Sequence, residues 1–158
     1  MKRFLLVAMI ALAITPCIAA DLPVLGDPPP VLSLPNLEGK PINLSDFSGK
    51  PIILTFFASW SKSCQQELAD LQELSDQYAG TLEVVTVSFD KKIKTLSEFV
   101  EQNKYTLNFL IDKKLTSLNK YAILIIPTTF CINREGKIDK IFVDYDENVK
   151  TAIAEWLK

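Results

Sequence analysis

The sequence predicts an α/β fold in which a mixed β-sheet carries helices on both faces. Two buried-strand patterns, Ile52–Ala58 and Leu82–Phe89, are separated by a stretch with helical spacing. This alternation favours parallel βαβ units, because the crossover helix packs back onto the sheet. Near the end of the chain two more strand patterns are joined by a tight turn, and a final helix follows. That hairpin adds an antiparallel edge, so the sheet is predicted to be mixed.

The first half of the domain supplies a central strand and the helix that follows it. A short strand is predicted over Ile42–Leu44, between the turn residues Gly39 and Gly49. Ile52–Ala58 is apolar apart from Thr55, which is typical of a strand buried on both faces. The helix is indicated by one apolar face with a spacing of three or four residues, made of Cys64, Leu68, Leu71, Leu74 and Tyr78.

The second half continues with the buried strand Leu82–Phe89. Thr95-x-x-Glu98 has the pattern of a capping box, which predicts that the next helix opens there. The remaining elements are expected in the order strand, short helix, two hairpin strands and final helix. They cover residues 107–112, 114–121, 128–133, 137–143 and 148–157.

The first 20 residues have the pattern of a secretory signal peptide. Lys2 and Arg3 precede the apolar stretch Phe4–Ile14, and small residues lead up to a cleavage site after Ala20. The apolar stretch is shorter than the ~20 residues that span a bilayer, which argues against an uncleaved anchor. We therefore predict export to the periplasm or cell envelope, with lipid attachment at Cys17 as the alternative.

The rest of the chain is expected to form one domain. Residues 21–35 are rich in proline and predict an extended lead-in, either a disordered tether or a binding segment. Residues 36–158 are assigned to the folded domain, a length that suits a single core. No transmembrane helix is expected in the mature chain.

The charge pattern excludes one class of partner. The formal net charge is −2, and no basic run is interleaved with aromatic residues, so nucleic-acid binding is not expected. Neither a metal nor a cofactor is predicted, and the oligomeric state stays open.

Two separated segments carry the functional signal. Trp60 and Cys64 flank Ser-Lys-Ser at the predicted junction between strand and helix, and Ile126-Pro127-Thr128 opens the hairpin. A proline that enters a strand indicates a cis peptide bond in a tight turn. Together these segments resemble the thioredoxin superfamily, and more narrowly the exported TlpA/ResA-type redoxins, over about residues 31–158. The resemblance implies a thioredoxin-like three-layer sandwich with a cis-proline loop.

The resemblance also implies roles for individual residues. In such proteins the first cysteine of Cys-x-x-Cys attacks a disulfide and the second resolves the mixed disulfide. Here Ser61 takes the position of the attacker and Cys64 that of the resolver, so the two-cysteine cycle is lost. Thr55 lies where thioredoxins carry a buried acid that helps to move a proton, and that aid is also expected to be missing. The implied substrate surface consists of Trp60, Ile126, Pro127 and Thr128.

Residue chemistry limits what this site can do. A nucleophilic serine needs a general base, and the chain has no histidine, so Ser61 is interpreted as the N-cap of the helix. Helix amides and Lys62 would lower the pKa of Cys64, whereas burial under Trp60 would raise it, and the sequence does not decide between them. Cys131 follows Pro127 by about 13 Å of strand, too far for a disulfide with a Cys64 that lies beside Pro127.

Three functional hypotheses remain, and whether the protein is an enzyme stays open. The first is a member of the thiol-disulfide oxidoreductase family whose residual redox chemistry runs through Cys64. The second is a non-catalytic module that binds an envelope protein or peptide client on the cis-Pro127 surface. The third is a one-cysteine peroxidase, since Ser61-x-x-Cys64 matches half of the peroxiredoxin motif. After the signal peptide, however, the chain has only Arg134 to activate a peroxide.

Overall fold

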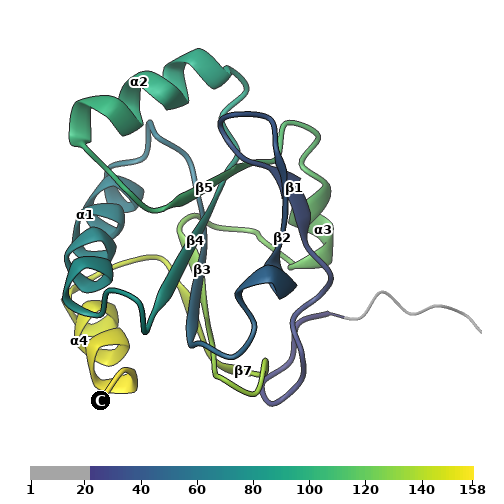
Figure 1. Cartoon of the computed structure of the whole chain (residues 1–158), viewed down its shortest axis with the longest axis vertical. Coiled ribbons are helices and arrows are strands. Elements are labelled where there is room, and N and C mark those ends of the chain that lie inside the picture. Colours follow the sequence, from purple (N-terminus) through teal and green to yellow (C-terminus); the bar gives the residue numbers. More distant parts are fainter. Residues whose placement is uncertain (1–21) are drawn as a thin grey trace, which may run out of the picture.

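A five-stranded mixed sheet forms the centre of the computed structural model, which describes residues 22–158 (Figure 1). The strand order is β5-β4-β3-β6-β7. The parallel strands are β3 (Ile52–Phe57), β4 (Glu83–Ser88) and β5 (Asn108–Ile111), and the antiparallel ones are β6 (Thr128–Ile132) and β7 (Ile138–Val143). The predicted α/β class and the mixed sheet are therefore confirmed.

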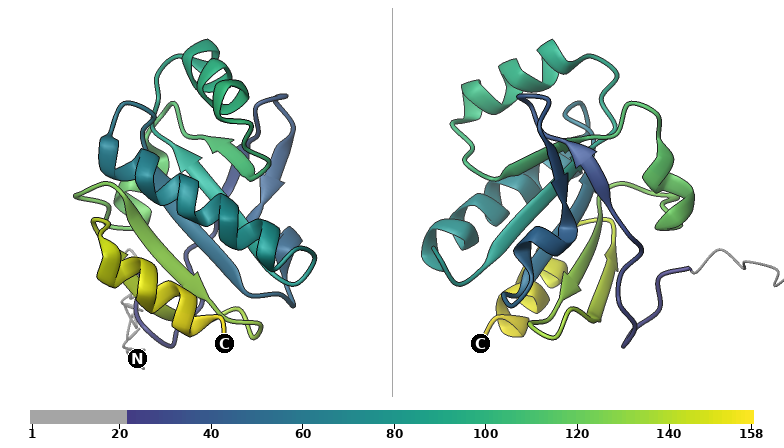
Figure 2. Two further views of the ribbon diagram at one scale, coloured as in Figure 1. Left: turned by 90° about the vertical axis from the view of Figure 1, so that its left-hand side faces the viewer. Right: turned by 45° about the vertical axis from the view of Figure 1, so that its right-hand side comes forward.

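Three helices cover one face of this sheet. They are α1 (Lys62–Gln77), α2 (Ile93–Asn103) and α4 (Glu147–Trp156), and Figure 2 shows α1 and α4 side by side across the strands. The predicted apolar face of α1 points inward, because Cys64, Leu68 and Leu71 are fully buried.

The opposite face carries smaller elements. The hairpin of β1 (Ser33–Pro35) and β2 (Pro41–Asn43), the 3-10 helix η1 (Leu44–Phe47) and the short helix α3 (Thr116–Lys120) lie there (Figure 1). None of the helices between residues 22 and 158 has the length and apolar content needed to cross a membrane.

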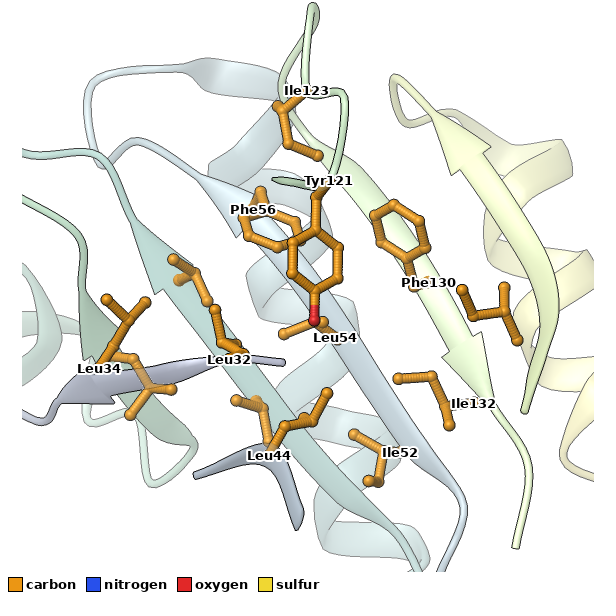
Figure 3. Packing of buried hydrophobic residues seen from close by; sticks show 14 residues of the cluster. Leu32, Leu34, Leu44, Ile52, Leu54, Phe56, Tyr121, Ile123, Phe130 and Ile132 are labelled. Carbon is orange, nitrogen blue, oxygen red and sulfur yellow. The ribbon is translucent and has the colours of Figure 1, made fainter. Parts of the chain in front are cut away.

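Strand β3 is buried on both faces, as its apolar run predicts. Ile53 and Phe57 point toward α1, whereas Leu54 and Phe56 point into the second core layer. There Phe56 packs with the rings of Tyr121 and Phe130, whose centroids lie 4.8 and 5.9 Å away (Figure 3). The sheet thus separates two apolar layers, and the functional segment follows its most buried strand.

The start of α2 differs from the sequence prediction. The helix begins at Ile93 with Lys92 as its N-cap, and no side chain caps it. The capping-box prediction is wrong, because Thr95 already lies inside the first helical turn.

The lead-in packs along the domain. The Gly26 N–H donates to the Ile138 carbonyl at 2.8 Å, and the Ile138 N–H donates to the Asp27 carbonyl at 2.9 Å. The Tyr121 hydroxyl donates to the Pro30 carbonyl at 2.6 Å. Leu32 lies in the core and β1 begins at residue 33, so the folded unit starts before the predicted boundary at residue 36.

We predict that Tyr121→Phe loosens the lead-in without disturbing the aromatic cluster. The ring stays, but the Pro30 carbonyl loses its donor, so the free energy of unfolding should fall by about 1 kcal/mol in urea titrations. Limited proteolysis should cut the lead-in faster. Tyr78→Phe is the matched control, because that hydroxyl makes no hydrogen bond within residues 22–158. Equal losses in both variants would show that the Tyr121–Pro30 bond contributes nothing.

Candidate active site

The motif lies where β3 ends and α1 begins. Ser61 has an extended backbone, and its hydroxyl accepts a hydrogen bond from the Cys64 N–H at 3.4 Å. The Gln65 N–H donates to the Ser61 carbonyl at 3.0 Å and closes the first turn. The predicted N-cap role of Ser61 is therefore confirmed.

Asp90 fixes the connection that carries the motif, a role the sequence analysis missed. Its carboxylate accepts hydrogen bonds from the Ser59 N–H and the Ser59 hydroxyl, both at 2.9 Å, and from the Ser88 hydroxyl at 2.7 Å. On the other side, the Gln65 side-chain amide donates to the Ser59 carbonyl at 2.6 Å. These contacts join the ends of β3 and β4 and hold Ser59 just before Trp60 and Ser61.

Cys64 is fully buried beneath this connection. Burial raises the pKa of its thiol above the ordinary value, and the nearby carboxyls of Glu67 and Asp144 act in the same direction. Hydrogen bonds from Ser61 and from the Ala58 backbone oppose the shift without reversing it. The sequence left open whether the helix amides or burial would dominate the pKa of Cys64. In the structure burial dominates, and Cys64 is a neutral thiol at neutral pH.

Glu67, one turn after Cys64 on the same helix, is the second residue that the sequence analysis missed. Its side chain is fully buried. The Thr55 hydroxyl donates to Glu67 Oε2 at 2.6 Å, and the Thr129 hydroxyl contacts Glu67 Oε1. The two threonine oxygens lie 2.9 Å apart. Glu67 thereby links α1 to the central strands β3 and β6.

The geometry of this ring favours a protonated carboxyl. Three hydrogen-bond contacts join Glu67, Thr55 and Thr129, but the two hydroxyls supply only two hydrogens. All three contacts are satisfied only when Glu67 carries a proton of its own. Burial also raises the pKa of Glu67 to about 7, although the two threonines partly offset the shift. Glu67 is therefore a buried acid that titrates near neutral pH.

This result corrects one expectation. Thr55 does not titrate, but the buried acid is present, because Thr55 binds a carboxyl supplied by α1 instead. The sequence held one usable signal. Glu67 lies three residues after Cys64 and directly before Leu68, within the apolar face of a predicted amphipathic helix. A carboxyl in that position must be buried or must disturb the packing of the face.

The cis-proline loop adjoins the helix start. The Ile126–Pro127 peptide bond is cis, as predicted. The Thr128 hydroxyl donates to the Ile125 carbonyl at 2.6 Å, and the Asp144 N–H donates to the Pro127 carbonyl at 2.8 Å. The Ser63 hydroxyl in turn donates to the Asp144 carboxylate at 2.7 Å. Asp144 therefore connects the first turn of α1 with the cis-proline loop.

Several large apolar side chains at this end of the sheet are exposed. Trp60 is 74% exposed and is not part of the core. Leu124, 94% exposed, and Ile125 precede the cis peptide bond, and the exposed Val143 pairs with Thr128 across the sheet. Of these four residues, only Trp60 was predicted from the sequence. Exposed apolar side chains gathered at one place indicate a binding surface.

Two other candidates lie apart from the site. Cys131 and Cys64 are both free, which confirms that they do not form a disulfide. Arg134 lies in the turn after β6, beyond Ile132, which pairs with the first residue of β3. That is the opposite end of the strand from Cys64. Among residues 22–158 no group of three or more His, Cys, Asp or Glu side chains could hold a metal ion.

Comparisons with known proteins agree with this geometry. The model of the AhpC/TSA family matches residues 25–141. Thioredoxin-like protein YneN of Bacillus subtilis is 36% identical over 121 residues, which cover 75% of this chain and 71% of that protein. Thiol-disulfide oxidoreductase ResA of Bacillus thuringiensis is 31% identical over 135 residues, which cover 85% of this chain and 77% of that protein. A Chlorobium tepidum crystal structure, described as thiol:disulfide interchange protein DsbE, superposes with a TM-score of 0.80 at 29% identity. The match covers 85% of this chain and 96% of that structure.

A helix that starts after the central strand, beside a cis-proline loop, defines a thioredoxin-like protein. The chain belongs to the AhpC/TSA family, and within it to the thiol-disulfide oxidoreductases of the ResA type.

We predict that Glu67 makes stability pH-dependent. Its pKa is raised from 4.5 to about 7 in the folded state, so the folded protein binds this proton more tightly. The stabilisation is complete below about pH 4.5 and is lost as the pH rises through 7. Between pH 5 and 8 the wild type should lose roughly 2 to 3 kcal/mol of unfolding free energy relative to Glu67→Gln.

Glu67→Gln suits this test, because the amide can accept from Thr55 and donate to Thr129 without titrating. Glu73→Gln removes an exposed carboxyl from the same helix and should keep the wild-type pH dependence. Urea unfolding at several pH values measures the difference. Parallel pH profiles for the wild type and Glu67→Gln would contradict the assignment.

Proposed function

We propose that this protein is an exported member of its family that binds client polypeptides without catalysing disulfide exchange. The observation that carries the proposal is the pair of residues at the motif positions. Ser61 has no sulfur, and Cys64 has no exposed surface.

Disulfide exchange by this motif needs two sulfurs. One thiolate attacks the client disulfide to form a mixed disulfide and releases one client thiolate, and the second thiol then displaces the client. Ser61 can do neither. Cys64 alone could reach only the mixed disulfide, and its buried thiol with a raised pKa supplies little thiolate for that attack.

The surface around the motif supports client binding. Trp60, Leu124 and Ile125 offer exposed apolar area. The backbone of Ile126 makes no hydrogen bond within the described chain, so its N–H and C=O are open to an extended segment. Added strands are commonly held by main-chain hydrogen bonds of this kind, with side-chain contacts giving selectivity. None of these features depends on the missing sulfur.

A second candidate function is residual redox chemistry at Cys64. The observation in its favour is Glu67, an acid with a pKa of about 7 on the same helix face, which could accept the thiol proton if the site opened. A partner would then have to supply the second sulfur. The peroxidase hypothesis has less support, because Arg134 lies at the far end of β6.

The expected cellular location is part of the proposal. The signal-peptide pattern of residues 1–20, and the alternative of lipid attachment at Cys17, fall outside the described residues. The composition of that segment supports export to the periplasm or cell envelope.

We predict that Cys64 reacts slowly with alkylating reagents. In a Cys131→Ala background, iodoacetamide should modify native Cys64 at least about tenfold more slowly than the urea-unfolded protein, because the thiol is buried and its pKa is raised. The rate should climb with pH up to and beyond 9. Turnover of oxidised insulin and of hydrogen peroxide should stay at background. Rapid alkylation at pH 7, or sulfenic acid on Cys64 after peroxide, would contradict the proposal.

We predict that Ser61→Cys restores a redox pair. The new thiol would lie at the N-terminus of α1, where helix amides favour the thiolate, and one turn from Cys64. The oxidised variant should contain an internal disulfide, and its dithiol form, regenerated by added dithiothreitol, should reduce insulin at least about tenfold faster than the wild type. Ser61→Ala is the matched control, because it changes the same position without adding a sulfur. A variant that forms the bond but stays inactive would show that the client surface has also changed.

A further inference from the structure

A hollow lies at the same end of the sheet as the motif but contains no motif residue. It has a volume of about 460 Å³ and is lined by the β1 hairpin, the start of α2 and the connection from β5 to α3. These elements lie next to one another in Figure 1. The volume falls in the range of about 300–1,000 Å³ that is usual for small-molecule sites.

The walls of this hollow are mainly apolar. Leu34 and Ile111 form its buried floor, and Pro35 and Ile93 are more exposed at its sides. Ile93, the first residue of α2, is 36% exposed although its side chain is apolar. An apolar ligand would cover this surface.

Two lysines stand at the edge of the hollow. Lys113 and Lys114 are exposed, and neither forms a salt bridge within residues 22–158. The one carboxylate in the lining, Asp112, accepts four hydrogen bonds from Thr116 and Ser117. The carboxylate of Asp112 is therefore bound by the start of α3 and not by the two lysines.

Further lysines lie beside the hollow, although the exposed acid Glu38 also lies between the lining residues Asn36 and Gly39. Lys91, Lys92 and Lys94 follow the neighbouring strand β4, and only Lys94 contacts an acid, Glu98, at a loose 3.8 Å. The chain as a whole carries a formal net charge of −2, so this concentration of lysines is not a general property of the surface. A positive potential at the mouth of an apolar hollow selects an anion that also has an apolar part.

We propose that this hollow binds a monomeric amphiphile with one anionic end, of the fatty-acid class. The apolar chain lies against Leu34, Ile93 and Ile111, and the carboxylate lies between Lys113 and Lys114. This site shares no residue with the thiol motif or the cis-proline loop, so it does not depend on the proposed client binding.

The test is titration of the purified protein with decanoate below its micelle concentration, followed by calorimetry and amide NMR shifts. Decanoate should bind and shift the amides of Ile93, Ile111 and Lys113. Lys113→Gln/Lys114→Gln should weaken binding at least fivefold, and added salt should weaken wild-type binding. Lys137→Gln/Lys140→Gln removes two exposed lysines of the distant hairpin and should leave the affinity unchanged.

Three further ligands separate the alternatives. Decanol lacks the charge and acetate lacks the chain, so each should bind at least fivefold more weakly than decanoate. Equal affinity for decanoate in the wild type and in Lys113→Gln/Lys114→Gln would overturn the proposal, as would equal affinity for acetate or decanol. Binding to phosphatidylglycerol vesicles without binding to decanoate would also overturn it, because the lysines would then serve a membrane surface and not a pocket.

Discussion

The buried carboxyl of Glu67 is the constraint on which the functional end of this molecule depends. It joins α1 to β3 and β6 through Thr55 and Thr129, two buried hydroxyl side chains in strands that are otherwise mostly apolar. A buried carboxyl without partners would cost several kcal/mol, so helix and strands must keep the one arrangement that satisfies it. The position of the first turn of α1 beside the cis-proline loop follows from that arrangement.

The same packing buries Cys64 and raises the pKa of its thiol. The N-terminus of a helix normally favours a thiolate through free N–H groups and the helix dipole. At Cys64 this effect competes with complete burial and with two carboxyls, Glu67 and Asp144, that disfavour a second negative charge. Burial is the largest of these contributions. A cysteine at the half-buried cap position would pay less of this penalty than Cys64, which is fully buried.

The fold could be read from the sequence where short-range patterns determine it. The apolar run of β3 and the spacing of Leu68 and Leu71 gave the central strand and α1 almost to the residue. The contacts that could not be predicted join residues that are distant in the sequence. Tyr121 and Pro30 are 91 residues apart in the sequence, and Glu67 and Thr129 are 62 residues apart. Local sequence patterns do not predict such long-range pairs. The α2 start was missed because Thr95 and Glu98 fit a capping box by type, although the chain enters the helix earlier.

Serine at the cap begins α1 without a sulfur atom. Ser is among the preferred N-cap residues, and Ser61 performs that role through the Cys64 N–H. The neighbouring contacts, from Asp90 to Ser59 and from Ser63 to Asp144, involve no sulfur. The loop that presents Trp60 and the cis-proline loop therefore keep their positions whichever side chain occupies residue 61. Sulfur chemistry and the proposed client surface therefore depend on different features. The first depends on the atom at residue 61, and the second on the backbone and exposed apolar side chains around it.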